Sequence, residues 1–168
     1  EAARILRHAK RTVILMGRVS RKREDWDKRV MLAERLGAAV LTDLKTGATF
    51  PTAHPLHPYP PGLYVSPDAG HLIREADAVL ALDWVDVAGT VRQACGGNLP
   101  AAKIIHCSLD QYVHNGYSMD YQALPPADLA VLASPDRLVD RLLDEMQDHA
   151  SPKKLPARAP VPEAGPET

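Results

Sequence analysis

The sequence lacks the features that mark several classes of protein. Its 168 residues contain no apolar run approaching the roughly 18 residues of a membrane helix, and its first residues do not resemble a secretory signal. With 20 Lys and Arg against 21 Asp and Glu, the net charge of −1 argues against an extended nucleic-acid or anionic-membrane surface. The two cysteines, Cys95 and Cys107, have no CxxC spacing, which favours reduced thiols over a disulfide. We therefore expect a cytoplasmic protein without a nucleic-acid or membrane partner.

Five short apolar runs predict the β-strands. They are mostly continuous rather than alternating, and they are rich in Val, Ile and Leu, which is typical of strands buried on both faces of a parallel sheet. A length of 168 residues suits one domain with its own core. The predicted strands are Thr12–Met16, Ala38–Thr42, Ala78–Leu82, Lys103–Cys107 and Leu129–Ala133.

Helical patterns lie between most of these runs. In Lys22–Leu36, apolar residues recur at spacings of three and four, and Gly37 follows where a left-handed residue often ends a helix. Ser66–Asp68 and Ser134–Asp136 each offer a serine N-cap, a proline at the first helical position and an acid in the first turn. Ala2–Ala9 predicts a shorter helix. The alternation indicates an α/β fold: a three-layer, doubly wound, Rossmann-like parallel sheet of five or six strands flanked by helices.

Two stretches interrupt this alternation. Thr46–Pro67 holds six prolines and no helical period, and Asp110–Asp128 contains the turn signal Asn115-Gly116. From Ser151 onward, five prolines occur in 18 residues, with few large apolar groups. We expect a domain over residues 1–148 and a proline-rich linker or tail over residues 149–168. We also expect this chain to be a piece of a longer protein.

The carboxyl ends of the predicted strands are the place to look for a ligand, because open parallel sheets bind ligands there, where the strand order reverses. For the order 3-2-1-4-5, this point lies between the first and fourth strands, next to the loops Gly17–Ser20 and Ser108–Gln111. Leu82–Gly89 ends the third strand on the same edge. Neither GxGxxG nor GxxxxGKS/T occurs, so no standard dinucleotide fingerprint or P-loop marks this edge.

A glycine and a basic cluster follow the first predicted strand. Gly17 permits backbone to approach a phosphate closely, or it serves the strand-to-helix turn alone. The cations oppose the dipole of the next helix, a conflict that a bound phosphate would relieve. The acids that follow them offer the alternative of a self-compensated surface. The basic residues are Arg18, Arg21, Lys22 and Arg23, and the acids are Glu24, Asp25 and Asp27.

The histidines give no clear chemical signal. His54 and His57 lie in the proline-rich stretch without a third ligand at a fixed spacing, so we expect no metal ligands there. His106 falls inside a predicted strand, and we interpret it as a core residue rather than half of a catalytic pair.

Acidic and hydroxyl side chains follow the third and fourth predicted strands. Asp83 and Asp86 either contact a ribose hydroxyl or cap the next turn, and we favour the cap. Ser108 and Asp110 have the same two options. No GxSxG or other nucleophile signature occurs.

The order and spacing of these pieces resemble one family: the central domain of thiamine-diphosphate-dependent enzymes of the acetolactate synthase, pyruvate oxidase and benzoylformate decarboxylase type. The resemblance runs over about residues 1–148. The long proline-rich loop coincides with the family's TGxFP…HPL segment. The matching stretches are Ala9–Gly17, Leu32–Val40, Thr46–Pro51 with His54–Leu56, Glu75–Leu82 and Lys103–His106.

The resemblance implies the middle domain of a three-domain enzyme. In that family the glutamate that activates the cofactor belongs to the N-terminal domain, and a Gly-Asp-Gly…Asn motif in the C-terminal domain holds Mg and the diphosphate. This sequence contains no Gly-Asp-Gly. We therefore expect the missing N- and C-terminal domains as partners, with a homo-oligomer as a further option. Thiamine diphosphate and Mg would belong to the parent enzyme and would not bind this fragment alone.

The family's middle domain binds FAD or an adenine nucleotide such as ADP in some members. Members that bind FAD have a glycine run after the first strand, whereas this chain has Gly17 followed by Arg18. Residues 57–62 likewise replace the glycine-rich stretch after HPL. We therefore expect no FAD, while the basic cluster keeps a smaller adenine nucleotide open. Carried over by position, the cofactor-binding residues would be Gly17, Arg18, Asp83, Asp86, Ser108 and Asp110.

The leading hypothesis is thus a mainly structural central domain of an enzyme for 2-oxo acid decarboxylation or carboligation, without catalysis by the isolated chain. The alternative is a nucleotide-binding module, for ADP or FAD, that uses the loop after the first strand. An NAD-dependent oxidoreductase is a third hypothesis, which the missing fingerprint disfavours.

Overall fold

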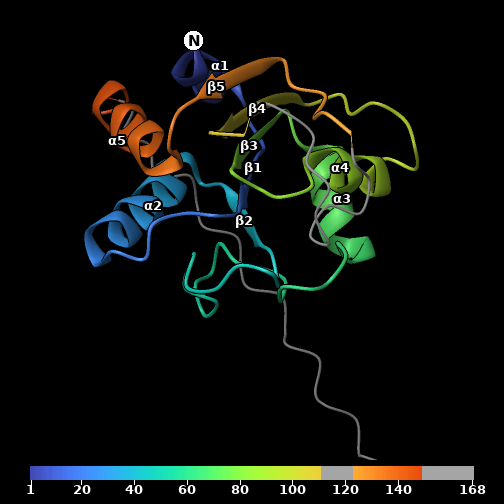
Figure 1. Ribbon diagram of the computed structural model, residues 1–168. Coiled ribbons are helices and arrows are strands. Elements are labelled where there is room, and N and C mark those ends of the chain that lie inside the picture. Colours follow the sequence, from blue (N-terminus) through green and yellow to red (C-terminus); the bar gives the residue numbers. More distant parts are fainter. Residues whose placement is uncertain (111–122, 149–168) are drawn as a thin grey trace, which may run out of the picture.

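A computed structural model describes residues 1–110 and 123–148. Within them, five parallel strands form one sheet in the order β2-β1-β3-β4-β5 (Figure 1). The five predicted strands are confirmed, with small differences at their ends. The strands are β1 Thr12–Met16, β2 Ala39–Thr42, β3 Ala78–Leu82, β4 Lys103–Ser108 and β5 Leu129–Leu132.

Helices cover both faces of this sheet. α1, α2 and α5 share one apolar core with it, and α3 and α4 share a second core on the opposite face (Figure 1). The layered α/β fold predicted from the sequence is therefore confirmed. Over residues 1–110 and 123–148, no helix combines the length and the hydropathy that a membrane span requires. The helices are α1 Ala2–His8, α2 Arg23–Leu36, α3 Pro67–Glu75, α4 Val87–Ala94 and α5 Pro135–Glu145.

The strand order differs from the order 3-2-1-4-5 used to place the switch point. β3 lies beside β1, so the order reverses between β1 and β3 rather than between the first and fourth strands. Burial explains this arrangement, because every residue of β3 is buried and the strand takes a central place, whereas β2 begins half-buried at an edge. The loops at the switch point are therefore those that follow β1 and β3.

The segments between strands agree with the sequence in part. Gly37 ends α2 with a left-handed φ of 56°, as predicted. Residues 43–66 contain no helix or strand, and Val40 N–H donates to the Leu56 carbonyl at 2.7 Å, so this loop covers the outer edge of β2. The sequence patterns did not indicate α4, which is short and contains Gly89. Asn115-Gly116 and the proline-rich residues 149–168 lie outside the described residues.

A buried arginine joins three segments on the α2 side of the sheet. The side chain of Arg29, on α2, has no exposed surface. Its guanidinium donates to the carbonyls of Thr49 at 3.1 Å and Ser20 at 2.9 Å, and it pairs with the Asp136 carboxylate. Asp136 also accepts the Ser20 N–H at 2.7 Å. One charged group therefore holds the loop after β1, the proline-rich loop and the start of α5.

The two Ser-Pro-Asp helix starts differ in a way that stability measurements will detect. The hydroxyl of Ser66 accepts the Ala69 N–H at 3.2 Å, whereas the Ser134 side chain makes no capping hydrogen bond. We expect Ser66→Ala to lower the free energy of unfolding by about 1 kcal/mol and Ser134→Ala by less than about 0.5 kcal/mol. Urea denaturation of both variants tests this, and equal losses would contradict the assignment of the cap.

Candidate functional site

The chain leaves β1 alongside the neighbouring strand β3. Gly17 N–H donates to the Leu82 carbonyl and Arg18 N–H to the Asp83 carbonyl, both at 3.0 Å. A Cβ on Gly17 would lie 2.1 Å from the Asp83 carbonyl oxygen, closer than real Cβ contacts come. Packing within the chain therefore requires glycine here. This agrees with the second of the two roles considered for Gly17, that of permitting the turn after the strand.

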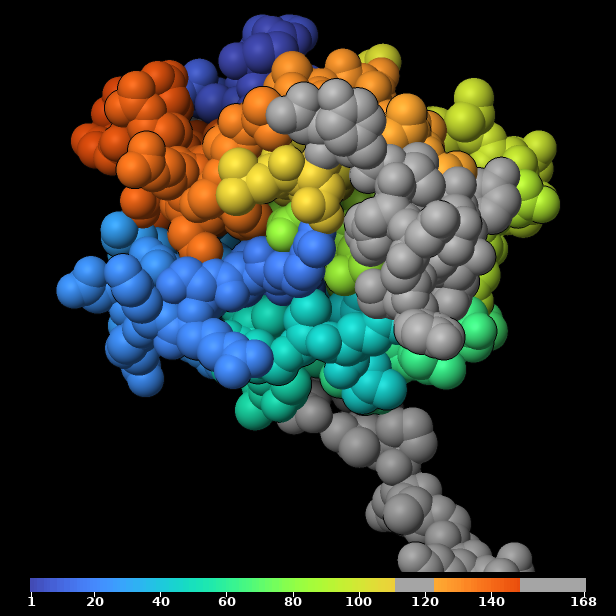
Figure 2. Space-filling model, viewed as in Figure 1, coloured from blue at the N-terminus to red at the C-terminus, as the bar shows by residue number. Residues whose placement is uncertain are grey.

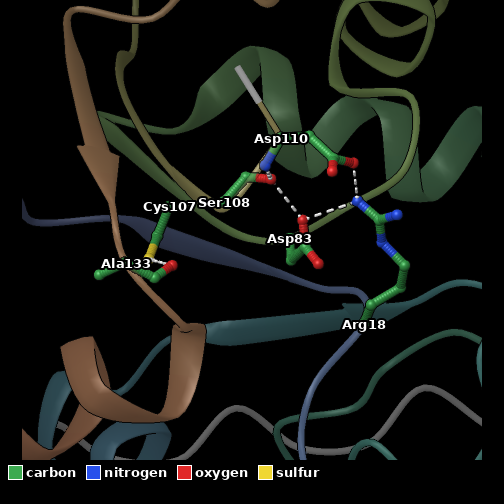
Figure 3. Close-up of polar contacts among 6 residues, drawn as sticks. All are labelled: Arg18, Asp83, Cys107, Ser108, Asp110 and Ala133. Carbon is green, nitrogen blue, oxygen red and sulfur yellow. Dashed lines mark hydrogen bonds and ion pairs between the residues drawn. The ribbon is translucent and has the colours of Figure 1, made fainter. Parts of the chain in front are cut away.

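Asp83 has an unusual backbone conformation at the end of β3. Its φ of 52° is left-handed, which Asp tolerates better than most residues. Its N–H donates to the Cys107 carbonyl at 2.8 Å, which ties this loop to β4. The conformation directs the carboxylate toward Arg18 and Ser108 (Figure 3).

Arg18 links the carboxyl ends of three strands. Its guanidinium pairs with Asp83 at 2.9 Å and also with Asp110 (Figure 3). Burial alone would lower the pKa of Arg18, but the hydrogen bonds to Asp110 and Asp83 outweigh it and raise this pKa. The Arg18 side chain is 42% exposed, so solvent weakens each ion pair. The guanidinium stays charged and occupies the edge of the sheet at the switch point.

Ser108 completes what we call the rim cluster, which consists of Arg18, Asp83, Ser108 and Asp110. The Ser108 hydroxyl donates to the Asp83 carboxylate at 2.6 Å and accepts the Asp110 N–H at 2.9 Å. In Figure 2, the blue segment that follows β1 lies next to the yellow end of β4. The cluster thus links three loops, and one guanidinium nitrogen of Arg18 contacts both carboxylates.

His106 lies next to this cluster on β4 and is half-buried rather than fully inside the core. Burial lowers the pKa of His106, and Arg18 acts in the same direction, against the opposing effect of Asp83 and Asp110. The folded chain therefore favours the neutral form of this ring.

Cys107 points to the opposite face of β4 and is fully buried. Its thiol donates to the Ala133 carbonyl at 3.3 Å (Figure 3). Burial, with a smaller contribution from Asp83, raises the pKa of the Cys107 thiol to about 11. The thiol is therefore a poor nucleophile in the folded chain.

We expect the two thiols to react at different rates. At pH 8, only about one Cys107 in a thousand would be a thiolate, and burial hinders access further, whereas Cys95 is partly exposed. Titration with Ellman's reagent should show one faster equivalent, lost in Cys95→Ser, and a second that appears on unfolding in guanidinium. Equal rates for both thiols in the native protein would contradict the burial of Cys107.

Asp86 lies apart from the rim cluster and caps α4. Its carboxylate accepts the Gly89 N–H at 2.8 Å, which confirms the cap favoured for it. The same prediction for Asp83 is wrong, because the left-handed backbone turns its carboxylate to Arg18 instead. Of the six predicted cofactor-binding residues, Gly17 and the rim cluster therefore come together, and Asp86 stands separately.

A cavity of about 410 Å³ lies beside α4, between the end of β2 and residues 59–66. Asp86, Trp84 and Thr90 line it, and the Trp84 indole N–H donates to the Thr90 hydroxyl at 2.8 Å. Sequence reasoning did not single out Trp84 or Thr90, although a tryptophan two residues after a buried strand was a usable signal. Contact between any of these residues and a cofactor stays a prediction.

The basic cluster at the start of α2 does not converge on one point. Arg18 pairs with Asp83 in the rim cluster, whereas Arg23 pairs with Asp27 at 2.9 Å. Arg21 and Lys22 are exposed. The alternative of a basic cluster neutralised by the acids that follow it therefore applies to Arg23. Arg18 instead has partners in the loops after distant strands.

His54 and His57 have separate partners. Leu56 N–H donates to His54 Nδ1 at 3.2 Å, so His54 Nε2 carries the proton that faces Glu34 at 3.2 Å. His57 Nε2 lies 2.8 Å from the Thr42 hydroxyl. Within residues 1–110 and 123–148, no three His, Cys, Asp or Glu side chains are grouped to hold a metal ion.

Two curated proteins share sequence with this chain. The sulfoacetaldehyde acetyltransferase of Alcaligenes xylosoxydans xylosoxydans is 39% identical over 111 residues, which are 65% of this chain and 18% of that protein. The protein of the same name from Castellaniella defragrans is 41% identical over 81 residues, 48% of this chain and 14% of that protein. The matches therefore span less than a fifth of these relatives.

Solved structures share the fold. The thiamine diphosphate-dependent 4-hydroxybenzoylformate decarboxylase of Rhodococcus jostii RHA1 superposes with a TM-score of 0.59 at 21% identity, covering 98% of this chain and 28% of that one. At this identity the likeness concerns the fold alone. A family model described as "thiamine pyrophosphate enzyme, central domain" matches residues 1–142 of the 168. The resemblance inferred from the sequence is therefore confirmed, and the chain belongs to the thiamine pyrophosphate enzyme central-domain family.

Proposed function

We propose that this chain serves as the structural middle domain of an enzyme that decarboxylates 2-oxo acids or joins the resulting carbon units. The observation that carries the proposal is the family match over residues 1–142. The names of the relatives, an acetyltransferase and a decarboxylase, support this reaction class. Thiamine diphosphate supplies such enzymes with an electron sink for the carbanion chemistry.

The residues of this chain do not fit the cofactor by themselves. A diphosphate bound through Mg²⁺ needs several oxygen ligands in a near-octahedral arrangement. The described residues offer no group of three acidic or histidine side chains, and the sequence has no Gly-Asp-Gly motif. We therefore assign thiamine diphosphate and Mg²⁺ to other domains of the same polypeptide, as the resemblance implies.

We propose that those domains are also the partners of this chain. We further propose that several copies of the complete protein assemble into a homo-oligomer. Large apolar side chains stay exposed at the carboxyl edge of the sheet, among them Leu44, Leu63 and Tyr64. An interface with the neighbouring domains would bury such groups. Two unpaired thiols, Cys95 and Cys107, support the proposal of a cytoplasmic location.

Turnover measurements test this proposal. The complete protein that contains this chain should consume pyruvate or another 2-oxo acid only when thiamine diphosphate and Mg²⁺ are added. The 168-residue chain should show no turnover under the same conditions. Turnover by the chain alone, or a complete protein inactive on 2-oxo acids with both cofactors, would contradict it.

A second candidate function is nucleotide binding, and the cavity beside α4 favours it. Its volume of about 410 Å³ suits a mononucleotide-sized ligand, and it combines apolar and polar walls. A thermal-shift series with ADP, FAD, CoA and NAD tests this candidate, because a ligand that binds the folded state raises the melting temperature. A shift with ADP would support it, and no shift with any of the four would reject it.

A further inference from the structure

Two cavities open at the carboxyl edge of the sheet, and the rim cluster lies between the loops that form them. The first, of about 410 Å³, contacts the loops after β2 and β3 together with α4. The second, of about 420 Å³, is lined by β4, β5 and residues 124–127, together with Ser108 and Asp110 of the rim cluster. The rim cluster joins the loops after β1, β3 and β4. It thus stands where the two groups of loops meet.

A dinucleotide on a doubly wound sheet crosses this edge at the switch point. Its diphosphate lies against the glycine turn after the first strand, where backbone N–H groups and the helix N-terminus face it. In this chain, the Arg18 side chain occupies that place, held by Asp83 and Asp110 (Figure 3). On its Cβ side, Gly17 packs directly against the backbone of Asp83, since a Cβ would lie 2.1 Å from the Asp83 carbonyl oxygen.

Four backbone N–H donors after β1 are also engaged within the chain. The N–H groups of Gly17 and Arg18 bond to β3 and its loop at 3.0 Å. Ser20 N–H donates to Asp136 at 2.7 Å, and Lys22 N–H to the Ser20 hydroxyl at 3.1 Å. α2 begins only at Arg23, so its free N-terminal donors are displaced from the turn. A diphosphate that used these four donors would therefore have to break existing hydrogen bonds.

From this geometry we infer that Arg18 is a specificity-determining residue, which blocks the crossing that an extended dinucleotide needs and restricts any nucleotide to one cavity. The inference deepens the nucleotide candidate above and does not depend on the reaction of the complete protein. The inference concerns two classes of ligand. Dinucleotides such as FAD and NAD are excluded, whereas the rim cluster does not obstruct mononucleotides such as ADP.

Affinity measurements on a rim variant test the inference. Removing Arg18 alone would leave two carboxylates facing a diphosphate, so the variant is Arg18→Gly/Asp83→Asn/Asp110→Asn, in which Asn tolerates the left-handed backbone at position 83. By calorimetric titration, we expect FAD and NAD to bind this variant at least about 10-fold more tightly than the wild-type chain, and ADP to change by less than about 3-fold.

A matched control lies at the opposite edge of the sheet. Arg11 contacts Glu75 at 3.0 Å and Asp77 at 4.0 Å, so Arg11→Gly/Glu75→Gln/Asp77→Asn changes the net charge by the same amount. This control should leave the affinities for FAD and NAD unchanged. An equal gain in the control would show a general charge effect and would overturn the inference.

Two further results would also overturn it: tight FAD or NAD binding by the wild-type chain, or a folded rim variant that gains nothing. If the triple variant fails to fold by circular dichroism, Arg18→Gly/Asp110→Asn serves instead, because it removes the arginine and one of the two facing carboxylates and leaves Asp83 unchanged. The expected gain in affinity for FAD and NAD is then at least about 3-fold. If the wild-type chain binds none of the nucleotides, the nucleotide candidate is rejected. That result still agrees with the exclusion of dinucleotides, which the rim variant tests separately. The two failures are therefore distinguishable.

Discussion

Arg29→Met is expected to lower the free energy of unfolding by about 3–5 kcal/mol, the usual cost of removing one partner from a buried ion pair. Methionine roughly preserves the volume but leaves Asp136 without its cation and two carbonyl oxygens without their donors. Domains of this size are stable by only about 5–15 kcal/mol, so the loss is a large fraction of the total. Guanidinium denaturation followed by circular dichroism measures it.

A double-mutant cycle identifies the cause of this loss. Asp136→Asn removes the charge from the partner, and Arg29→Met/Asp136→Asn removes both. Because an uncompensated charge is the main penalty, the double variant should be less destabilised than the sum of the single variants. Arg35→Met, which removes a single hydrogen bond to the Leu143 carbonyl, serves as the control with a loss near 1 kcal/mol. Additive single losses would contradict a coupled buried pair.

Gly17→Ala is expected to destabilise the chain by about 3 kcal/mol, since overpacking against backbone leaves no flexible side chain to yield. The added Cβ would lie 2.1 Å from the Asp83 carbonyl oxygen and 2.5 Å from Trp84 Cα. β1 and β3 would have to separate at the switch point, and the hydrogen bonds of Gly17 and Arg18 to β3 and its loop would weaken.

The same chain offers a matched control for Gly17. A Cβ on Gly47 would meet nothing within 4 Å, so Gly47→Ala should change stability by less than about 1 kcal/mol, in either direction. Thermal melts of both variants in one buffer give the comparison. Equal melting temperatures for the two variants would show that the turn after β1 is looser than described.

The fold followed from the sequence because burial leaves a strong pattern. β1 and β3 are buried on both faces and therefore appear as almost continuous apolar runs. Which strand lies beside which is a different question, because burial reports how many neighbours a strand has and not their identity. The expected order consequently misplaced β3, although all five strands were found. α4 escaped notice because eight residues hold little more than two turns of helical pattern.

The candidate site was predicted only as a set of positions. The resemblance located the loops after β1, β3 and β4, and the structure brings their polar residues together there. The pairing itself could not be derived, because Arg18 is 65 residues from Asp83 and 92 from Asp110 in the chain. Arg29 was missed for a related reason: a cation on the apolar side of α2 was a signal, but its partner lies 107 residues away.

Calorimetric titration of thiamine diphosphate with Mg²⁺ tests most directly whether this chain is a scaffold whose reactive cofactor is held elsewhere. The complete protein should bind the cofactor in a saturable manner, and the 168-residue chain should give only heats of dilution. Saturable binding by the chain alone, or its absence from the complete protein, would contradict the assignment.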